Sequence, residues 1–391
     1  MFPKVVSRKR IFLPISLLAT IAVSVFLSPL AGAQTYTVLH HFDQTNGPSP
    51  LPQPLFLDSH GTLYGSTKYG GTGGGTVYKL EQNRTFTTLY SFPGWSDDCF
   101  YPSSAVTVDP SGNIYGPALA WEPGYGGGGA IFKIDPSGVE TIMHHFLFLG
   151  VNGENPTTSL IPDKHGFLLG TTAGGGTSGY GVIYRINPSN GAGGVIYNFS
   201  GPDGNFPGAI VKGAGGTLYG STIVGGAFDV GTIYKIDSQL KQTVLYSFTG
   251  GPDGGYPNSG IALDSQGNIF GTTDSGGAND AGTVFKVSPD GTETVLHDFS
   301  YFSTDGLRPA AGVAIDKAGN VYGTTEYGGT LNGGILFGVD ASGTFTILHN
   351  FDEIGGINPI TTLMVDADGT IFGTTSLGGL HGSGVAFRLR P

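Results

Sequence analysis

The feature that most constrains this chain is a short glycine-containing pattern that returns seven times at an almost constant spacing. It reads GTLYGSTKYGG at residues 61–71 and GNVYGTTEYGG at residues 319–329. The shared glycines are Gly65, Gly116, Gly170, Gly220, Gly271, Gly323 and Gly373, with steps of 51, 54, 50, 51, 52 and 50 residues. Seven copies at one period predict a repeat architecture. Glycine in a disordered tract would not keep this register with the apolar residues, so the glycines of the seven copies belong to a folded repeat.

Each copy contains four short stretches of the β-branched and aromatic residues that favour strands. In one copy these stretches are residues 261–263, 268–272, 282–287 and 294–299. A D-x-x-G turn that begins at Asp264 joins the first two, and Asp caps N–H groups in such a turn while Gly accepts a positive φ. Four strands in about 50 residues are the signature of a propeller blade. We expect the glycine of the second strand to let neighbouring backbones approach closely.

The two ends of the repeat region predict a closed ring. Residues 35–42 read TYTVLHHF and match the fourth strand of other copies, such as QTVLYSF at 242–248. The seventh copy ends with its third strand at residues 384–391. An N-terminal strand that completes the last blade would leave no blade unpaired. The predicted fold is therefore all-β: a seven-bladed β-propeller with four strands per blade, closed by strand 35–42 in the C-terminal blade.

The first 33 residues are predicted to be a secretory signal peptide, followed by one propeller domain over residues 34–391. Basic residues precede a long apolar run, and Ala31-Gly32-Ala33 fits a cleavage site. A retained membrane anchor is the alternative, and the cleavage site favours removal. We thus expect a secreted protein, periplasmic or extracellular, with no membrane span after cleavage.

The formal charge disfavours two classes of partner, and the cysteine content rules out an internal disulfide. Residues 1–33 hold four basic and no acidic residues, so the rest of the chain has 14 basic and 29 acidic residues, a formal charge of −15. This balance disfavours nucleic acid and anionic lipid as partners, because both need a basic surface. Cys99 is the single cysteine, so no internal disulfide can form.

The repeat resembles the GloVer tandem-repeat family of exported bacterial proteins. The residues that carry the resemblance are the G-x-[LI]-[YF]-G-[ST]-T runs, a following G-G pair, and G-x-[VI]-[YF]-K as at residues 75–79 and 231–235. It spans essentially all of residues 35–391 and is specific for the repeat rather than for an activity. Members of this family often carry a C-terminal surface anchor, and the terminal FRLRP does not match one.

Variable loops on one face predict where a ligand binds. In an up-and-down blade the D-x-x-G turn and the turn between strands three and four share one face, and the longer connectors and loops share the other. Loops that vary on a rigid ring are the usual place for binding, so we expect a site on that face and at the mouth of the central channel. The second copy departs most from its siblings there, with PGWSDDCFYP at 93–102 and ALAWEPGYGGGG at 118–129.

These two loops hold a cluster of aromatic and acidic residues. Its members are Trp95, Asp97, Asp98, Phe100, Tyr101, Trp121, Glu122 and Tyr125. Aromatic rings stack on sugar C–H faces and carboxylates bond to hydroxyl groups, so the cluster is the candidate ligand site. The alternative is that the rings only pack the extended loops onto the propeller, and this alternative stays open.

The histidines and repeated aspartates are interpreted as structural. His40, His144, His297 and His349 share one fourth-strand position with Tyr90, Tyr197 and Tyr246, which indicates packing rather than general-base chemistry. The D-x-x-G aspartates lie in separate copies, with Gly213 in their place in the fourth copy, which indicates turn capping rather than a shared calcium ion. Acidic residues such as Asp203, Asp253 and Glu326 lie on the variable side, and nothing selects a catalytic pair from them.

These patterns favour a monomeric, non-catalytic binding or scaffold propeller that recognises an extracellular carbohydrate or a surface partner. Two alternatives stay open: a propeller-type lyase or glycoside hydrolase, and a protein–protein interaction platform. No cofactor or metal is expected, because the sequence lacks H-E-x-x-H, C-x-x-C and a phosphate loop with lysine.

Overall fold

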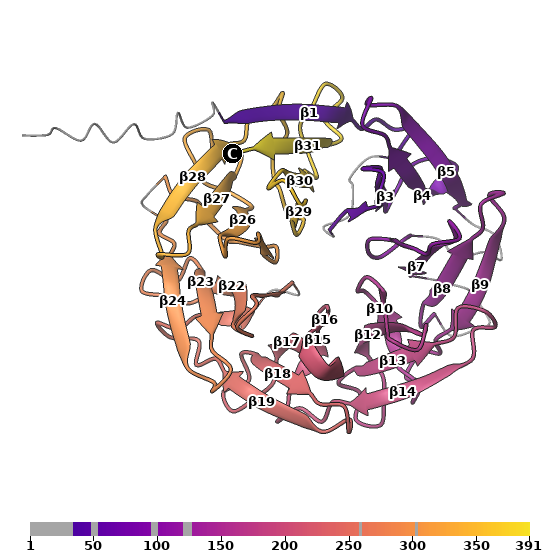
Figure 1. The fold of residues 1–391 in the computed structure, drawn as a ribbon, viewed down its shortest axis with the longest axis horizontal. Helices are drawn as coiled ribbons and strands as arrows, with labels where there is room; N and C mark the ends of the chain where they lie inside the picture. The colour runs from indigo at the N-terminus through magenta and orange to yellow at the C-terminus, as the bar shows by residue number, and fades with distance from the viewer. Residues whose placement is uncertain (1–33, 48–53, 95–100, 120–126, 258–259, 302–303) are drawn as a thin grey trace, which may run out of the picture. The chain divides into compact units, whose positions relative to one another are not determined.

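Seven antiparallel sheets stand around one axis, and each sheet is one copy of the repeat (Figure 1). The computed structural model describes residues 34–47, 54–94, 101–119, 127–257, 260–301 and 304–391. Residues 34–391 form one compact unit. The predicted all-β propeller of seven four-stranded blades is confirmed. No α-helix occurs in the described ranges.

The first four blades comprise the following elements. Blade 1 is β2 (Phe56–Leu57), β3 (Leu63–Thr67), β4 (Gly73–Leu80) and β5 (Phe86–Pro93). Blade 2 is β6 (Thr107–Val108), β7 (Ile114–Ala118), β8 (Ala130–Ile134) and β9 (Glu140–His145). Blade 3 is β10 (Glu154–Pro156), β11 (Ile161–Pro162), β12 (Leu168–Gly174), β13 (Val182–Ile186) and β14 (Gly193–Asn198). Blade 4 is β15 (Asn205–Pro207), β16 (Val211–Lys212), η1 (Ala214–Gly216), β17 (Leu218–Val224), β18 (Thr232–Ile236) and β19 (Gln242–Ser247).

Three further blades complete the ring. Blade 5 is β20 (Gly255–Pro257), β21 (Ala262–Leu263), β22 (Ile269–Ser275), β23 (Thr283–Val287) and β24 (Glu293–Asp298). Blade 6 is β25 (Ala314–Ile315), β26 (Val321–Thr325), β27 (Ile335–Val339) and β28 (Phe345–Asn350). Blade 7 is β29 (Met364–Val365), β30 (Ile371–Thr374), β31 (Val385–Arg390) and β1 (Thr35–His41). In blades 3, 4 and 5 the connector adds an extra short strand (β10, β15, β20) to the second strand of the blade.

The ring closes through the N-terminal strand, as the sequence predicts. Strand β1 pairs antiparallel with β31, placing Thr35 opposite Arg390 and His41 opposite Val385. Figure 1 shows the indigo β1 beside the yellow β31 on the outside of the ring. Blade 7 therefore has four strands like its siblings, and no blade of the ring is left incomplete.

The D-x-x-G turns are held by their aspartates. Asp264 Oδ1 accepts the backbone N–H groups of Gln266 at 2.9 Å and Asn268 at 2.8 Å. The same acceptor role is taken by Asp58, Asp109, Asp163, Asp316 and Asp366. The capping interpretation is confirmed, and each carboxylate is engaged within its own blade.

The glycine of each second strand is covered by an aromatic ring from the third strand. Gly271 stands directly opposite Phe285, and a Cβ on Gly271 would lie 2.5 Å from the ring's Cζ. The same pairing recurs as Gly65–Tyr78, Gly116–Phe132, Gly170–Tyr184, Gly220–Tyr234, Gly323–Phe337 and Gly373–Phe387. The expectation that these glycines bring backbones together is therefore wrong. Each glycine instead leaves room for a ring, a known way to stabilise a glycine within a sheet.

That same ring also joins neighbouring blades. The centroid of Phe285 lies 5.0 Å from that of Phe248, the last aromatic of the preceding blade, with the rings edge to face. Equivalent pairs are Phe42–Tyr78, Phe92–Phe132, Phe146–Tyr184, Phe199–Tyr234, Phe299–Phe337 and Phe351–Phe387. All seven pairs are buried. Every blade boundary is thus built from one glycine and two aromatic rings.

The shared His/Tyr position of the fourth strand is a packing position, as predicted. His297 stacks on Phe345 of the next blade with centroids 3.7 Å apart, and its Nε2 lies 3.0 Å from Asp305. Tyr246 fills the same position in blade 4 and donates its hydroxyl to Asp253 at 2.8 Å. The side chain at this position therefore fastens the outer strands together and holds the connector that follows.

Replacing Gly271 with Ala should destabilise the fold, because the added methyl group displaces the Phe285 ring from both of its contacts. We expect a loss of about 1 to 3 kcal/mol in the free energy of unfolding, typical of overpacking. Denaturant titration of Gly271→Ala and of Gly194→Ala measures this. Gly194 is the control, because a Cβ there meets no atom within 4 Å and its φ is not in the left-handed region. Equal stability of both variants would contradict the ring-covering role.

Stability should fall as the pH decreases from 7 to 5. Burial lowers the pKa of His40, His144, His297 and His349 below the ordinary value of 6.5. A lowered folded pKa means that the neutral form is favoured in the fold, so this contribution is complete above pH 6.5 and is lost as histidines protonate below it. Glu293 acts in the opposite direction, because burial and Asp253 raise its pKa to about 7.

Comparing how Tm changes with pH in two variants separates the contribution of the four histidines. The variant with all four changed to Tyr, the residue that blades 1, 3 and 4 carry there, should show a smaller drop in Tm between pH 7 and 5. His60→Gln is the control, because this turn side chain is 86% exposed. An unchanged pH dependence in the fourfold variant would show that the buried histidines do not limit acid stability.

Candidate functional site

Short turns lie on one face of the ring and long loops on the other, as the alternation of connections in an up-and-down blade requires. Gln82, between strands β4 and β5, donates its Nε2 to the carbonyl of His60 in the D-x-x-G turn at 3.0 Å, so these two turns share a face. We call this the short-turn face and the opposite one the long-loop face. Of the exposed large apolar side chains in the described chain, all but Val139 and Leu240 belong to loops or strand ends of the long-loop face. Exposed apolar side chains are therefore more numerous on the long-loop face than on the short-turn face of the described chain.

Most of the predicted aromatic and acidic cluster lies outside the described residues. These members are Trp95, Asp97, Asp98, Phe100, Trp121, Glu122 and Tyr125, so their grouping stays a prediction. Tyr101 is described. It stands at the long-loop end of blade 2, and its ring lies 5.5 Å from that of Tyr69 in blade 1, edge to face. Its carbonyl accepts the N–H of Leu119, so it is held directly before the loop that contains Trp121.

Tyr101 belongs to a set of equivalent residues that the sequence analysis did not single out. Each precedes the buried proline with which the connector enters a blade, and each has a φ between +53° and +61°. We call this set the axial ring: Tyr101, Asn155, Phe206, Tyr256, Arg308 and Asn358. The signal in the sequence was the recurring connector end, such as GGYP at 254–257 and GLRP at 306–309. In blades 3, 4 and 5 its segment (β10, β15, β20) pairs with the second strand of the blade, on the same inner side as the first strand.

The left-handed backbone of these residues serves the assembly of the ring. The N–H of Tyr256 donates to the carbonyl of Val230 in the preceding blade at 2.7 Å, and each of the other five makes the equivalent bond. The next residue, Pro257, packs on Gly231 of the same preceding blade. This geometry is costly, because L-residues avoid positive φ and a residue before proline favours extended backbone. Glycine would supply the same N–H and the same φ without that cost.

The axial ring instead carries side chains that can recognise a ligand. It contains three aromatic rings, two amides and one guanidinium group. Phe206 is 46% exposed and Tyr256 is 40% exposed, although the prolines that follow them are buried. The backbone role therefore explains the φ angle and does not itself require these side chains.

Neighbouring blades contact one another through these side chains. Arg308 of blade 6 lies 3.4 Å from Asp274 of blade 5 and 3.3 Å from Glu326 of its own blade. Tyr327 of blade 6 hydrogen bonds to Asn358 of blade 7, and its bond to Glu326 raises the pKa of Tyr327. Together with the Tyr69–Tyr101 contact, these interactions link the axial ring to the ends of the second strands.

The carboxylates that the sequence placed on this face are mostly engaged in holding loops. Asp203 accepts the hydroxyl of Tyr197, and Asp305 lies beside His297. Asp229 and Asp280 accept N–H groups at the start of their own loops, at 3.1 Å and 2.9 Å. Glu326 pairs with Arg308. No two of these carboxylates are brought together as an isolated pair by the contacts in the described chain.

Two negative findings apply to the described ranges. Within them, no three His, Cys, Asp or Glu side chains gather in a way that could hold a metal ion. No helix in the same ranges has the length and apolar character needed to cross a bilayer.

Sequence comparison identifies the repeat. The family model described as the Gloeobacter/Verrucomicrobia repeat matches residues 23–223 and again residues 164–387. The chain belongs to this family. The resemblance to the GloVer family drawn from the quoted motifs is therefore confirmed. No curated protein matches the chain.

Solved structures similar to this Gloeobacter/Verrucomicrobia repeat protein share its fold at low identity. An oligogalacturonate lyase from Vibrio parahaemolyticus aligns with a TM-score of 0.58 at 10% identity, over 90% of this chain and 93% of that one. An oligogalacturonate lyase in complex with manganese gives 0.57 at 12%, over 90% and 92%. The extracellular domain of a two-component-system protein from B. thetaiotaomicron gives 0.56 at 14%, over 92% of this chain and 42% of that one. The chain thus spans about two fifths of the length of that domain, and these likenesses show the fold alone.

The cost of the left-handed backbone predicts that, at position 256, a glycine variant is more stable than an alanine variant. Both Tyr256→Gly and Tyr256→Ala remove the side chain, and only Gly relieves the positive φ. We expect the Gly variant to be more stable than the Ala variant by about 1 kcal/mol, the reverse of the usual order. Thermal or chemical unfolding of the two variants tests this, and a more stable Ala variant would disprove the strain.

Proposed function

We propose that this protein is an exported, non-catalytic binding propeller that holds a neutral carbohydrate on its long-loop face, around the axial ring. The observation that carries the proposal is the retention of six recognition-type side chains at positions where glycine would cost less. Aromatic rings stack on the C–H faces of sugars, and amide and guanidinium groups bond to their hydroxyls. The exposed apolar side chains of the same face support this placement.

Charge favours a neutral over an acidic carbohydrate. The guanidinium of Arg308 is matched by two carboxylates, Asp274 and Glu326, so it offers hydrogen bonds without a net positive charge. The chain without residues 1–33 carries a formal charge of −15, which repels polyanions. Tyr101 belongs both to the axial ring and to the predicted cluster around Trp95 and Trp121, so the two sets would form one continuous site. Export rests on the predicted signal peptide at residues 1–33.

The test is a calorimetric titration of the protein with fragments of neutral polysaccharides, with product analysis on the same samples. We expect saturable binding without product. The double variant Phe206→Gly with Tyr256→Gly should weaken binding at least tenfold, about 1.4 kcal/mol, without lowering Tm, because glycine accepts the backbone angle at both positions.

Tyr301→Ala is the matched control, because this exposed tyrosine lies on the same face outside the axial ring. Its affinity should equal that of the unchanged protein. Undiminished affinity in the double variant would refute the axial ring as the site. Release of product would instead favour the alternative of a propeller lyase or hydrolase, and binding of proteins but of no glycan would favour an interaction platform.

A further inference from the structure

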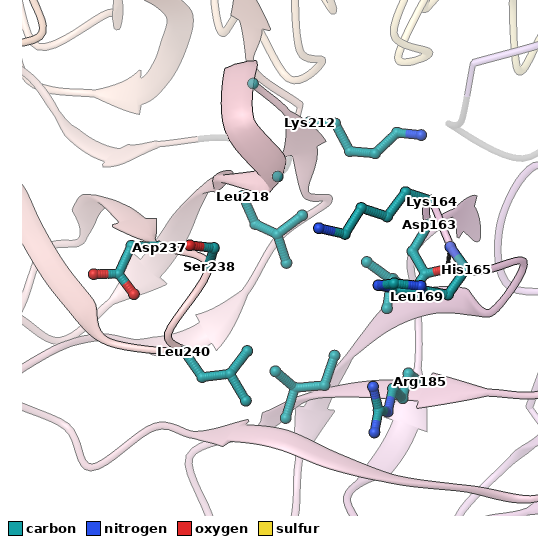
Figure 2. A pocket seen from close by; sticks show the side chains of 13 residues that line it. Asp163, Lys164, His165, Leu169, Arg185, Lys212, Leu218, Asp237, Ser238 and Leu240 are labelled. Atoms are coloured by element: carbon teal, nitrogen blue, oxygen red, sulfur yellow. Dashed lines mark hydrogen bonds between the residues drawn. The ribbon is translucent and has the colours of Figure 1, made fainter.

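A pocket of about 460 Å³ opens between blades 3 and 4, on the short-turn face and thus on the opposite side from the axial ring. Its walls are the two D-x-x-G-type turns and the strand-three-to-four turn of blade 4. Figure 2 shows Lys164 reaching between the blades, with Lys212 above it and Arg185 below it in the view. A volume of this size suits a small molecule.

The pocket lies where blade 4 departs from the repeat at its turn. Where the other blades end their first strand with an apolar residue, blade 4 has Lys212; the others have Leu57, Val108, Pro162, Leu263, Ile315 and Val365. Where six blades have the capping Asp, blade 4 has Gly213. The short η1 turn follows, and a Cβ on Gly215 or Gly216 would meet no atom within 4 Å. This turn therefore has no side chain at its glycines to fill the space beside blade 3.

The same substitutions reverse the charge of the turn. Relative to the other six blades, blade 4 loses one negative charge and gains one positive charge, which adds to the cations Lys164 and Arg185. None of these three cations forms an ion pair with a residue in the described ranges. The ammonium of Lys212 donates to the carbonyl of Pro162 at 2.6 Å, and the guanidinium of Arg185 lies 5.0 Å above the Phe167 ring.

Two carboxylates also line the pocket, and both are committed to their own turns. Asp163 accepts the N–H groups of His165 and Phe167, and Asp237 accepts those of Gln239 and Lys241. In Figure 2 the carboxylate of Asp237 lies on the far side from the amine of Lys164. The lysine, arginine and aspartate side chains of the lining, three cations and two anions, leave one net positive charge, which suits a ligand with a single negative charge.

The rest of the lining is aliphatic. Leu169 and Leu218 are buried at the base, and Ile196 and the half-exposed Leu240 extend the apolar surface outward. A purely polar anion would leave this surface wet, and a purely apolar molecule would leave the cations unused. We infer that this pocket binds a small amphiphilic carboxylate, with its carboxyl group near Lys164 and Lys212 and its hydrocarbon body against the leucines.

Octanoate is the probe, and calorimetric titration is the measurement. We expect saturable binding of octanoate, little binding of the uncharged octanol, and a rise in Tm with octanoate concentration, because a ligand that binds only the folded state stabilises it. Lys164→Gln and Lys212→Leu should each weaken the octanoate affinity about tenfold or more. Leu is the residue type that blades 1 and 5 carry at the place of Lys212.

The repeat supplies a matched control. Lys317 holds the same turn position in blade 6 that Lys164 holds in blade 3, and it is exposed as well. Lys317→Gln should keep full affinity. Equal affinities of Lys164→Gln and Lys317→Gln, or equal binding of octanol and octanoate, would overturn the proposal. If Lys212→Leu folds poorly, the octanoate affinity of Lys164→Gln alone tests the proposal, because the Lys164 side chain is exposed on a turn.

The axial-ring variant with Phe206→Gly and Tyr256→Gly should bind octanoate normally, which separates this site from the proposed carbohydrate site.

Discussion

The structure depends on one arrangement that is repeated at every blade boundary: an aromatic ring that lies across a glycine and touches a second ring from the preceding blade. Gly271, Phe285 and Phe248 are one example. A side chain on the glycine would move the first ring, and the second ring would lose its contact. Because both the sheet and the boundary use the same ring, a blade cannot change its internal packing without changing its neighbour. This coupling explains why the glycine and the two aromatic residues recur at one period along the chain.

The sequence predicted the features that depend on period and local turn chemistry. The seven glycines gave the number of blades, the match of residues 35–42 to the fourth strands gave the closure, and Asp264 and its equivalents gave the turns. The sequence did not reveal what each glycine faces, because the partner ring is set by strand register. It also did not reveal the positive φ of residues such as Tyr256, because a tyrosine before proline gives no local sign of that angle. The predicted cluster around Trp95 and Trp121 stays a prediction.

The two proposed sites differ in how they arise from a repeat. The axial ring keeps one backbone geometry in six blades and varies the side chain, as Asn155, Phe206 and Arg308 illustrate. The inter-blade pocket arises where one blade abandons the common turn. Gly213 was visible in the sequence as a missing aspartate, but its consequence needed the position of Lys164 in the adjacent blade. Comparison of copies within a chain can therefore locate candidate sites in two ways, through variation at a fixed position and through a single departure from the pattern.

The closure of blade 7 by β1 has a consequence for how the ring forms. The first strand of the propeller to be synthesised pairs with the last one, so the ring cannot be completed until the whole chain is present. Until β1 docks, the completed β31 presents an open edge, and the β1 strand of a second copy offers it the same hydrogen bonds. Monomers and strand-exchanged dimers thus share one set of contacts, and the effective concentration of a chain's own β1 decides between them. The seam that seals the ring is also the place where two rings can become linked.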